Sequence, residues 1–300
     1  MKTTLKDLFK KIYRALPIVR ELHFIEGQLS PVSPQSDLIR ANSIIQALNT
    51  IKASDPRYRD QQRLLVYGAQ YWSQNYEDGM IAEIFRRIGA VSRTFLEIGV
   101  GDGSENNTTA LLIFGWKGWW IEGSETNCKS ISARLNEMPN LALRLKVRQA
   151  FVNPDNTENL LADFGVPVEV DLFSLDIDLN TYHIWAALTK FKPRVVVVEY
   201  NAGIPPIQVW IHPFESNLVW DGTQAFGASL KAYELLGRKF GYSLVGCDVI
   251  GINAFFVRDD LVKDHFAAPF TSENHYEPPR YQLVHRFGHP SKFYGETYSK

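Results

Sequence analysis

Apolar and polar residues follow two different rhythms along the 300-residue chain, and the change falls near residue 94. Before that point, apolar residues recur at the three- and four-residue spacing of amphipathic helices. The segments with this spacing are 5–16, 38–51 and 79–88, and Gly89 is a stop signal for the last of them. We expect a helical N-terminal extension over residues 1–72, in which the Pro- and Ser-rich stretch 30–37 is a linker.

From residue 94 onward, short apolar runs alternate with helical segments. Strands are expected at TFLEIG, GWWIEG, LRLKVRQA, VDLFSLDID and PRVVVVEYN, followed by a closing pair, YSLVGCD and INAFFVR. Alternating strands and helices imply parallel pairing with right-handed crossovers. The pattern predicts an α/β fold with a Rossmann-like, doubly wound, seven-stranded sheet, mostly parallel and with an antiparallel C-terminal strand. This domain should span residues 73–258, and residues 259–300 should form an aromatic-rich C-terminal extension.

Composition narrows the class of protein without identifying it. The net charge is −1, the chain has two cysteines, and no apolar run approaches the roughly 20 residues that span a bilayer. Charges interrupt the N-terminal apolar clusters, which is unlike a signal peptide. These features predict a cytoplasmic protein with free thiols and no nucleic-acid partner. The basic helix at 5–16 leaves two interpretations open: contact with an anionic membrane surface, or packing on its own domain or on a second subunit.

The first predicted strand runs into a loop that combines glycines with acids, FLEIGVGDGSENNT. The glycines are Gly99, Gly101 and Gly103, and the acids are Glu97, Asp102 and Glu105. Glycines permit a tight turn and the close approach of a ligand. The acids would repel the diphosphate of a dinucleotide, because two unit charges about 4 Å apart interact by about 4 kcal/mol at an effective dielectric of about 20. The loop therefore favours a positively charged ligand, such as the sulfonium and ammonium of S-adenosylmethionine.

The second predicted strand ends in Glu122, where an acid of this fold can accept hydrogen bonds from ribose hydroxyls. An NAD site would use the same acid, so Glu122 alone does not discriminate. Together, FLEIGVGDG and WIEG resemble the class I S-adenosylmethionine-dependent methyltransferases. The wider set SQNYEDGMIAEIF, SLDID, VVVVEYN and GCDVIGINAFFV is similar to a bacterial group related to the FkbM-like methyltransferases, over residues 73–258.

This resemblance implies a cofactor site for S-adenosyl-L-methionine. Its residues would be Glu97, Gly99, Gly101, Asp102, Gly103, Asn107, Glu122, Gly123, Ala150 and Asp176. Glu97 or Asp102 would face the methionine ammonium, and the segment around Ala150 would contact adenine. Asn107 would reach the methionine carboxylate or cap the next helix. Leu179 stands where the family pattern prefers glycine, which leaves the substrate open.

Acids also end the fourth and fifth predicted strands. Asp176 and Asp178 are two residues apart and share a face of an extended chain, as do Glu199 and Asn201. Because strand ends meet at one edge of the sheet, we expect these oxygens to gather there. One hypothesis is a Mg²⁺ site made by Asp178, Glu199 and Asn201. The other is metal-free catalysis with Asp178, Glu199 or His183 as the general base. Alternatively, Asp178 and Asn180 cap the following helix at Thr181, and His183 is a surface residue.

Two segments beyond the strands invite further hypotheses. The stretch 202–224 lacks periodicity, and so long a loop in a compact domain is usually functional or disordered. Its aromatic residues favour an ordered, substrate-binding lid, with His212 as a second candidate base, or a loop packed on the N-terminal helices. The histidines after residue 259 lack the spacing of metal ligands, so this tail is expected to pack on the core.

These observations predict an S-adenosylmethionine-dependent methyltransferase. The resemblance implies O-methylation of a hydroxyl on a sugar, a glycan or a small metabolite, as in polysaccharide biosynthesis. Two competing hypotheses are a nicotinamide-dependent oxidoreductase and a cofactor-binding assembly module without catalysis. Calorimetry that compares S-adenosylhomocysteine with NADH distinguishes the methyltransferase from the oxidoreductase. Substitution of Asp178 and Glu199 distinguishes it from the assembly module, because an enzyme should lose turnover and keep its affinity for the cofactor.

Overall fold

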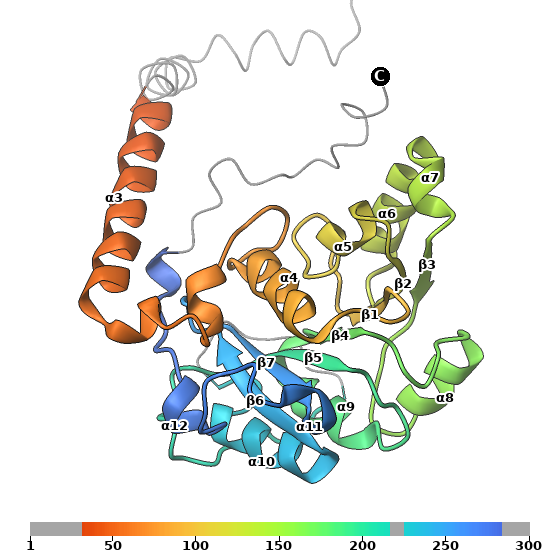
Figure 1. Cartoon of the computed structure of the whole chain (residues 1–300). Helices are drawn as coiled ribbons and strands as arrows, with labels where there is room; N and C mark the ends of the chain where they lie inside the picture. The colour runs from red at the N-terminus through yellow and green to blue at the C-terminus, as the bar shows by residue number, and fades with distance from the viewer. Residues whose placement is uncertain (1–31, 217–224, 284–300) are drawn as a thin grey trace, which may run out of the picture. The chain divides into compact units, whose positions relative to one another are not determined.

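The computed structural model describes residues 32–216 and 225–283 and divides the chain into two compact units, 1–54 and 55–300 (Figure 1). In the first unit, the described part is helix α3 (Val32–Ser54). It begins inside the stretch expected to be a linker, and Pro34 is compatible with this because the first turn of a helix leaves its N–H groups unused. The helix ends just before Asp55, as predicted. The basic helix expected at 5–16 lies outside the described residues.

The second unit is built on a seven-stranded sheet with the order β3-β2-β1-β4-β5-β7-β6. The strands are β1 (Thr94–Ile98), β2 (Lys117–Glu122), β3 (Leu145–Gln149), β4 (Leu172–Leu175), β5 (Val195–Glu199), β6 (Tyr242–Cys247) and β7 (Asn253–Arg258). Strands β1 to β5 are parallel, and β7 is antiparallel to both β5 and β6. The prediction of a doubly wound, mostly parallel sheet is confirmed.

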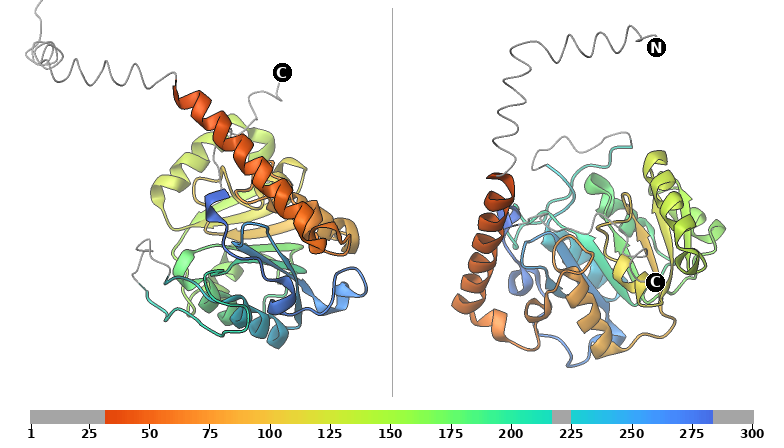
Figure 2. Two further views of the ribbon diagram at one scale, coloured as in Figure 1. Left: turned by 90° about the vertical axis from the view of Figure 1, so that its left-hand side faces the viewer. Right: turned by 90° about the horizontal axis from the view of Figure 1, so that it is seen from above.

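Helices cover both faces of this sheet (Figure 1). On one face lie α4 (Glu77–Ile88), α5 (Thr109–Ile113) and α6 (Glu125–Glu137), and on the other lie α8 (Thr157–Asp163), α9 (Thr181–Ala187) and α10 (Leu230–Phe240). The short helix α7 (Pro139–Ala142) contacts β3, and α12 (Ser272–His275) contacts β6. Figure 2 shows in two further views that helices lie on both sides of the sheet. The short elements are α11 (Asp259–Val262), η1 (Pro56–Arg59), η2 (Leu64–Tyr67), η3 (Asp178–Asn180) and η4 (Tyr281–Leu283). In the sheet, β2 and β3 follow β1 on one side, whereas β4 and β5 lie on its other side. The strand order thus reverses between β1 and β4, which is where this fold class binds ligands.

The core lies between the sheet and its helices. The four valines of β5, Val195 to Val198, are fully buried, as a strand covered on both faces requires. Trp185 of α9 packs against Phe256 of β7 with 5.0 Å between ring centroids. Full burial of such side chains stabilises the fold by about 1.5–3 kcal/mol each.

Segments on either side of the predicted 73–258 domain belong to the same compact unit. Arg63 donates hydrogen bonds to the backbone oxygen of Asn274 at 2.9 Å and to its side-chain oxygen at 2.6 Å. Arg57 pairs with the buried carboxylate of Glu277 at 3.2 Å. Burial lowers the pKa of His275 to about 3, so this histidine is neutral. The described part of the C-terminal extension therefore packs on the core, and His285 and His289 lie outside the described residues.

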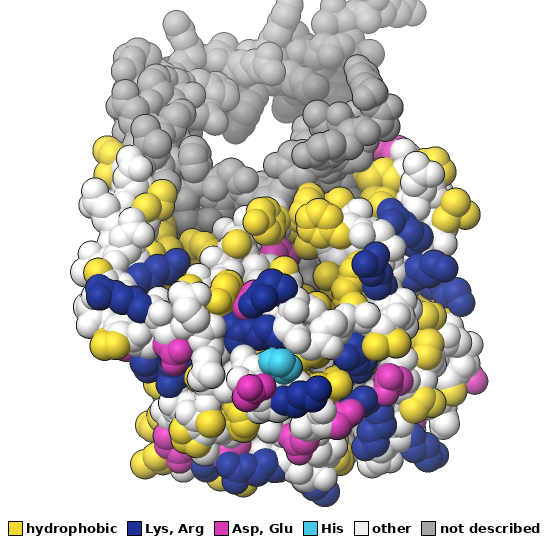
Figure 3. All heavy atoms as spheres, viewed as in Figure 1, with side chains coloured by type: hydrophobic (Ala, Val, Ile, Leu, Met, Phe, Trp, Pro, Cys, Tyr) yellow, Lys and Arg dark blue, Asp and Glu magenta, His cyan; other side chains and the backbone are white. Residues whose placement is uncertain are grey.

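The composition led to expectations about the cysteines, membrane-spanning segments and surface charge. Cys128 and Cys247 are both free thiols. Within residues 32–216 and 225–283, no helix is long and apolar enough to cross a membrane. On the face of the molecule in Figure 3, Lys and Arg side chains are interspersed with acidic and apolar ones.

Candidate active site at the carboxyl ends of the strands

A recess of about 170 Å³ lies beyond the carboxyl end of β1. The residues that line it include four acids, Glu77, Glu97, Glu105 and Asp176, and five side-chain amides, Gln74, Asn75, Asn106, Asn107 and Asn253. None of its described lining residues is Lys, Arg or His. The recess therefore presents carboxyl and amide groups, and no cationic side chain from these lining residues, to any ligand that enters it.

Two glycines of the loop after β1 bring separate parts of the site into contact. Gly99 has a φ of +85°, and a Cβ at this position would lie 1.7 Å from the backbone oxygen of Asp176. A Cβ on Gly103 would lie 2.6 Å from the ring of Trp120. The close approach at Gly99 lets the end of β4, and with it Asp176, join the recess.

Glu97 is buried beneath this loop and organises it. Its two oxygens accept hydrogen bonds from the Asn106 amide at 2.6 Å, the backbone N–H groups of Asn107 and Thr108 at 3.1 Å each, and the hydroxyls of Thr108 at 2.6 Å and Ser174 at 2.9 Å. Burial raises the pKa of Glu97, and these hydrogen bonds oppose the shift. A carboxylate has about four lone-pair sites, so five donors saturate it. Glu97 is thus engaged inside the protein, although the resemblance assigned it or Asp102 to an ammonium.

Asp102 is engaged as well. It pairs with Arg134 of α6 and accepts a hydrogen bond from the backbone N–H of Ser104 at 3.0 Å. Burial alone would raise the pKa of Asp102, but the hydrogen bonds from Ser104 and Arg134 outweigh it and lower the value. The side chain is not among those that line the recess. An ammonium in the recess would therefore need other acceptors.

Glu122 ends β2 at the border of the same loop. Its oxygens accept hydrogen bonds from the backbone N–H groups of Gly101 and Ser124, both at 2.8 Å. The Asn127 amide also donates a long hydrogen bond to Oε1 at 3.5 Å, so the lone pair that stays open for a hydroxyl donor is on Oε2. The exposed ring of Phe151 lies over Gly123, where a Cβ would come within 2.6 Å of it. With Ala150, whose N–H donates to the Glu122 backbone oxygen at 3.0 Å, these residues form one corner at the ends of β2 and β3.

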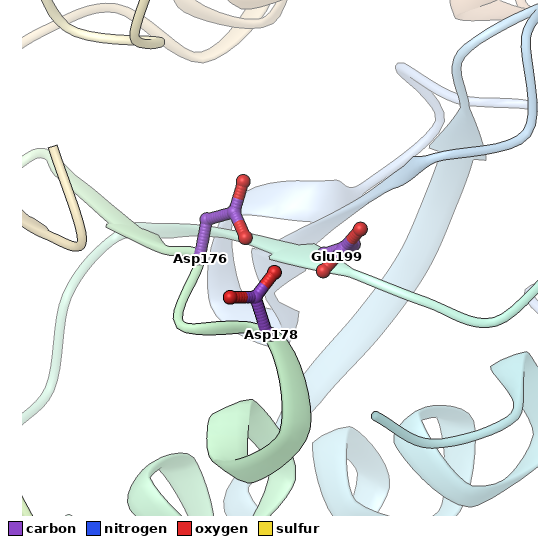
Figure 4. Close-up of side chains that lie close together, drawn as sticks. All are labelled: Asp176, Asp178 and Glu199. Carbon is purple, nitrogen blue, oxygen red and sulfur yellow. The ribbon is translucent and has the colours of Figure 1, made fainter. Parts of the chain in front are cut away.

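The predicted gathering of acids at the ends of β4 and β5 is present. Oxygens of Asp176, Asp178 and Glu199 all lie within 4.8 Å of one another, and Figure 4 shows the three carboxyl groups directed toward one space. Asp178 has a φ of +55°, a conformation that is rare outside glycine and is often found at functional sites. Oε2 of Glu199 is buried without a hydrogen-bond partner.

Like charges this close cannot all stay ionised, so the cluster shares protons. Burial and the neighbouring Asp178 raise the pKa of Asp176 to about 7. Burial and both aspartates raise the pKa of Glu199 well above its ordinary value. The two aspartates keep an exposed side toward solvent, while protein atoms crowd their other sides. Such a cluster can accept a proton near neutral pH.

Asn201, the fourth predicted oxygen donor, has its amide engaged elsewhere. Its nitrogen donates to the backbone oxygen of Phe226 at 3.0 Å, and its oxygen accepts from Gly203 at 3.0 Å. Of the three predicted Mg²⁺ ligands, the two carboxylates of Asp178 and Glu199 therefore remain. Asp178 lies in η3 and does not cap the next helix, because the N-cap of α9 is Asn180, without a side-chain cap hydrogen bond.

The two candidate histidines hold the loop after β5. Nε2 of His183 lies 2.7 Å from the backbone oxygen of His212, and Nδ1 of His212 lies 2.7 Å from that of Pro213. The Asn180 amide donates to the backbone oxygen of Glu215 at 2.9 Å. The loop is thus anchored beside the carboxylate cluster, and the part of the predicted lid at 217–224 lies outside the described residues.

Sequence reasoning missed one wall of the recess. Asn75 comes from the segment before α4, Glu77 is the first residue of α4, and Asn253 is the first residue of β7. All three side chains are at most 4% exposed. The polar run SQNYED, placed directly before an amphipathic helix, was the available signal. The spacing of the polar residues in this run does not predict that the segment lies next to the glycine loop.

No protein-family model and no curated protein matches the chain. Solved structures that resemble the chain include the magnesium protoporphyrin IX methyltransferase ChlM of Synechocystis PCC 6803 with bound S-adenosylhomocysteine, at 13% identity and a TM-score of 0.41, over 61% of this chain and 81% of that one. Another is an S-adenosylmethionine-dependent methyltransferase of Clostridium acetobutylicum ATCC 824, at 12% identity and 0.38, over 59% and 89%. A third is the glycopeptide N-methyltransferase MtfA complexed with S-adenosyl-L-methionine, at 15% identity and 0.35, over 59% and 85%. Similarity this low transfers no activity or ligand, and the fold assignment rests on the strand order above.

Proposed function

We propose that this chain is a methyltransferase that uses S-adenosyl-L-methionine. One observation carries the proposal: the recess at the fold's ligand-binding edge is lined by four acids, and no basic residue is among its described lining residues. A cationic sulfonium and ammonium suit this lining, whereas the diphosphate of NAD does not. The finer assignment to the FkbM-like group rests on the sequence resemblance alone.

The residues present fit this cofactor. Glu122 keeps a lone pair on Oε2 available to a ribose hydroxyl, and Gly123 with Ala150 borders the place for adenine. The backbone of the glycine loop, Asn107 and Asp176 border the methionine end. When bound, S-adenosylmethionine supplies a methyl group that is already activated on a cationic sulfur.

The chain's own contribution to the chemistry is to position an acceptor and remove its proton. Because the pKa of Asp176 is raised to about 7 and that of Glu199 is raised well above its ordinary value by burial and by its aspartate neighbours, the cluster holds at least one proton near neutrality. An ionised oxygen on Asp178 or Glu199 can accept the proton of a hydroxyl, and such a base contributes about 10²–10⁴-fold to a rate. We propose O-methylation, with a hydroxyl of a sugar, glycan or small metabolite as the acceptor.

The same three carboxylates form a set of hard oxygen donors that suits Mg²⁺. Asp176, Asp178 and Glu199 would hold such an ion, which would neutralise the cluster and orient two acceptor oxygens. Since Asn201 is bonded to the backbone instead, we favour the metal-free arrangement.

The test is a comparison of Glu199→Gln with Glu137→Gln, a control at an exposed position of α6. Titration calorimetry measures S-adenosylhomocysteine affinity, and release of S-adenosylhomocysteine with a panel of hydroxyl-bearing sugars measures turnover. We expect Glu199→Gln to lower turnover by about 100-fold or more while its affinity stays within twofold of wild type. Unchanged turnover would refute the role of the cluster. Binding of NADH in place of S-adenosylhomocysteine would refute the proposed cofactor.

A further inference from the structure

One side chain in the recess wall has a polar atom that the protein leaves unsatisfied. Asn75 is 2% exposed, and its Oδ1 is buried without a hydrogen-bond partner. Leaving such a group unpaired lowers stability, so native proteins rarely do so without a functional reason. Because Asn75 lines the recess, a ligand bound there can supply the missing donor.

The backbone around Asn75 is held in a fixed conformation. Oδ2 of Asp78 accepts hydrogen bonds from the N–H groups of Tyr71 and Trp72, both at 2.7 Å, and of Ser73 at 2.9 Å. Tyr76, the next residue, has a φ of +73°, which is strained for a bulky side chain. The surrounding hydrogen bonds maintain this strain, so Asn75 is presented to the recess by a preorganised segment.

The neighbours of Asn75 determine which ligand group fits. The buried carboxylate of Glu77 accepts hydrogen bonds from the Asn75 N–H and from the Asn253 amide, both at 2.6 Å. Burial raises the pKa of Glu77, and the hydrogen bonds from Asn75 and Asn253 oppose the shift and occupy both of its oxygens. Asp176 supplies an accessible carboxyl group to the same recess. An unpaired acceptor oxygen in a recess that is lined by acids, with no basic residue among its described lining residues, suits a protonated amine.

We propose that Asn75 binds the α-ammonium of the methionine end of the cofactor, accepting a hydrogen bond through Oδ1. The inference rests on the proposed function and extends it, because the acids expected to take this group, Glu97 and Asp102, are engaged within the protein. Asn75 thereby distinguishes ligands that carry the amino-acid end from nucleoside thioethers that lack it.

The test combines two protein variants with three ligands in titration calorimetry. The variants are Asn75→Ala and, as a matched control, Asn136→Ala at an exposed position of α6. The ligands are S-adenosylhomocysteine, its analogue without the amino group, and 5′-methylthioadenosine, which lacks the amino-acid end. We expect Asn75→Ala to weaken S-adenosylhomocysteine by about 10- to 100-fold, the usual effect of losing a hydrogen bond to a charged group. Affinity for the other two ligands should stay within twofold.

The outcomes separate this inference from the proposed function. Equal losses for all three ligands, or no loss for S-adenosylhomocysteine, would overturn the role of Asn75 and leave the cofactor assignment intact. Failure of the wild-type chain to bind any of the three ligands would overturn the proposed function, and this inference with it. Thermal unfolding of both variants checks their folding, and 5′-methylthioadenosine binding by Asn75→Ala shows that its nucleoside corner is formed.

Discussion

Replacing Gly101 by alanine probes the space that we assign to the cofactor. Gly101 has a φ of +56°, and no atom lies within 4 Å of the place where a Cβ would stand. The residue also lines the recess. An added methyl group therefore meets no protein atom and points into space that is open in the free protein.

Two effects of Gly101→Ala can be sized separately. The left-handed backbone costs about 1–2 kcal/mol of stability for a residue with a Cβ. In a domain of this size, each kcal/mol lowers the melting temperature by about 2–4 °C. If the cofactor occupies the open space, the methyl group overpacks it, which costs about 1–3 kcal/mol. That loss corresponds to an affinity about 5- to 150-fold weaker.

Gly241→Ala is the matched control. Gly241 is the C-cap of α10 in the same left-handed region, with φ 81° and ψ 41°, and a Cβ there would lie 4.0 Å from an Asp259 oxygen. The two variants should lose similar stability in thermal unfolding. Only Gly101→Ala should lose affinity for S-adenosylhomocysteine in titration calorimetry.

Wild-type affinity for S-adenosylhomocysteine in Gly101→Ala would refute this reasoning, because the space beside Gly101 would then not belong to the ligand. A comparable loss of affinity in both variants would also refute it, by showing that affinity follows overall stability.

Further predictions concern the buried acids, the histidine and the metal. Glu97→Ala should lower the free energy of unfolding by about 3–5 kcal/mol in urea titration, because five donors lose their acceptor, and a loss below about 1 kcal/mol would contradict this. Since the pKa of Asp176 rises from 3.8 to about 7 on folding, its stabilising effect is complete in acid and is lost as the pH rises through 7. Asp176→Asn should therefore raise the melting temperature at about pH 8 and leave it unchanged at about pH 3. A melting temperature raised at pH 3 and unchanged at pH 8 would contradict the raised pKa of Asp176. His183→Ala should retain turnover within about tenfold, because its ring nitrogen bonds the loop backbone, and a loss like that of a missing base, about 100-fold or more, would reassign it. Turnover should survive EDTA treatment, whereas a loss that Mg²⁺ restores would favour the metal site.

The fold could be predicted from the sequence because its signals are local. Each strand of the sheet overlaps a segment that the sequence pattern predicts to be a strand, and the four valines of β5 indicated burial on both faces. The cluster of Asp176, Asp178 and Glu199 was also accessible, since parallel topology brings the ends of β4 and β5 to one edge of the sheet.

The rest of the site depends on contacts that spacing does not encode. Glu97 is saturated partly by Ser174, which is 77 residues away in the chain. His183 is engaged by the backbone oxygen of His212, and backbone acceptors leave no mark in a sequence pattern. Asn75 became a candidate only when the structure placed it in the recess without a partner for its oxygen.

The most direct test is calorimetric titration of the wild-type chain with S-adenosylhomocysteine and, separately, with NADH. The acidic lining of the recess predicts saturable binding of S-adenosylhomocysteine and none of NADH at the same concentrations. Binding of NADH with no heat from S-adenosylhomocysteine would contradict the assignment of this recess to a cationic cofactor.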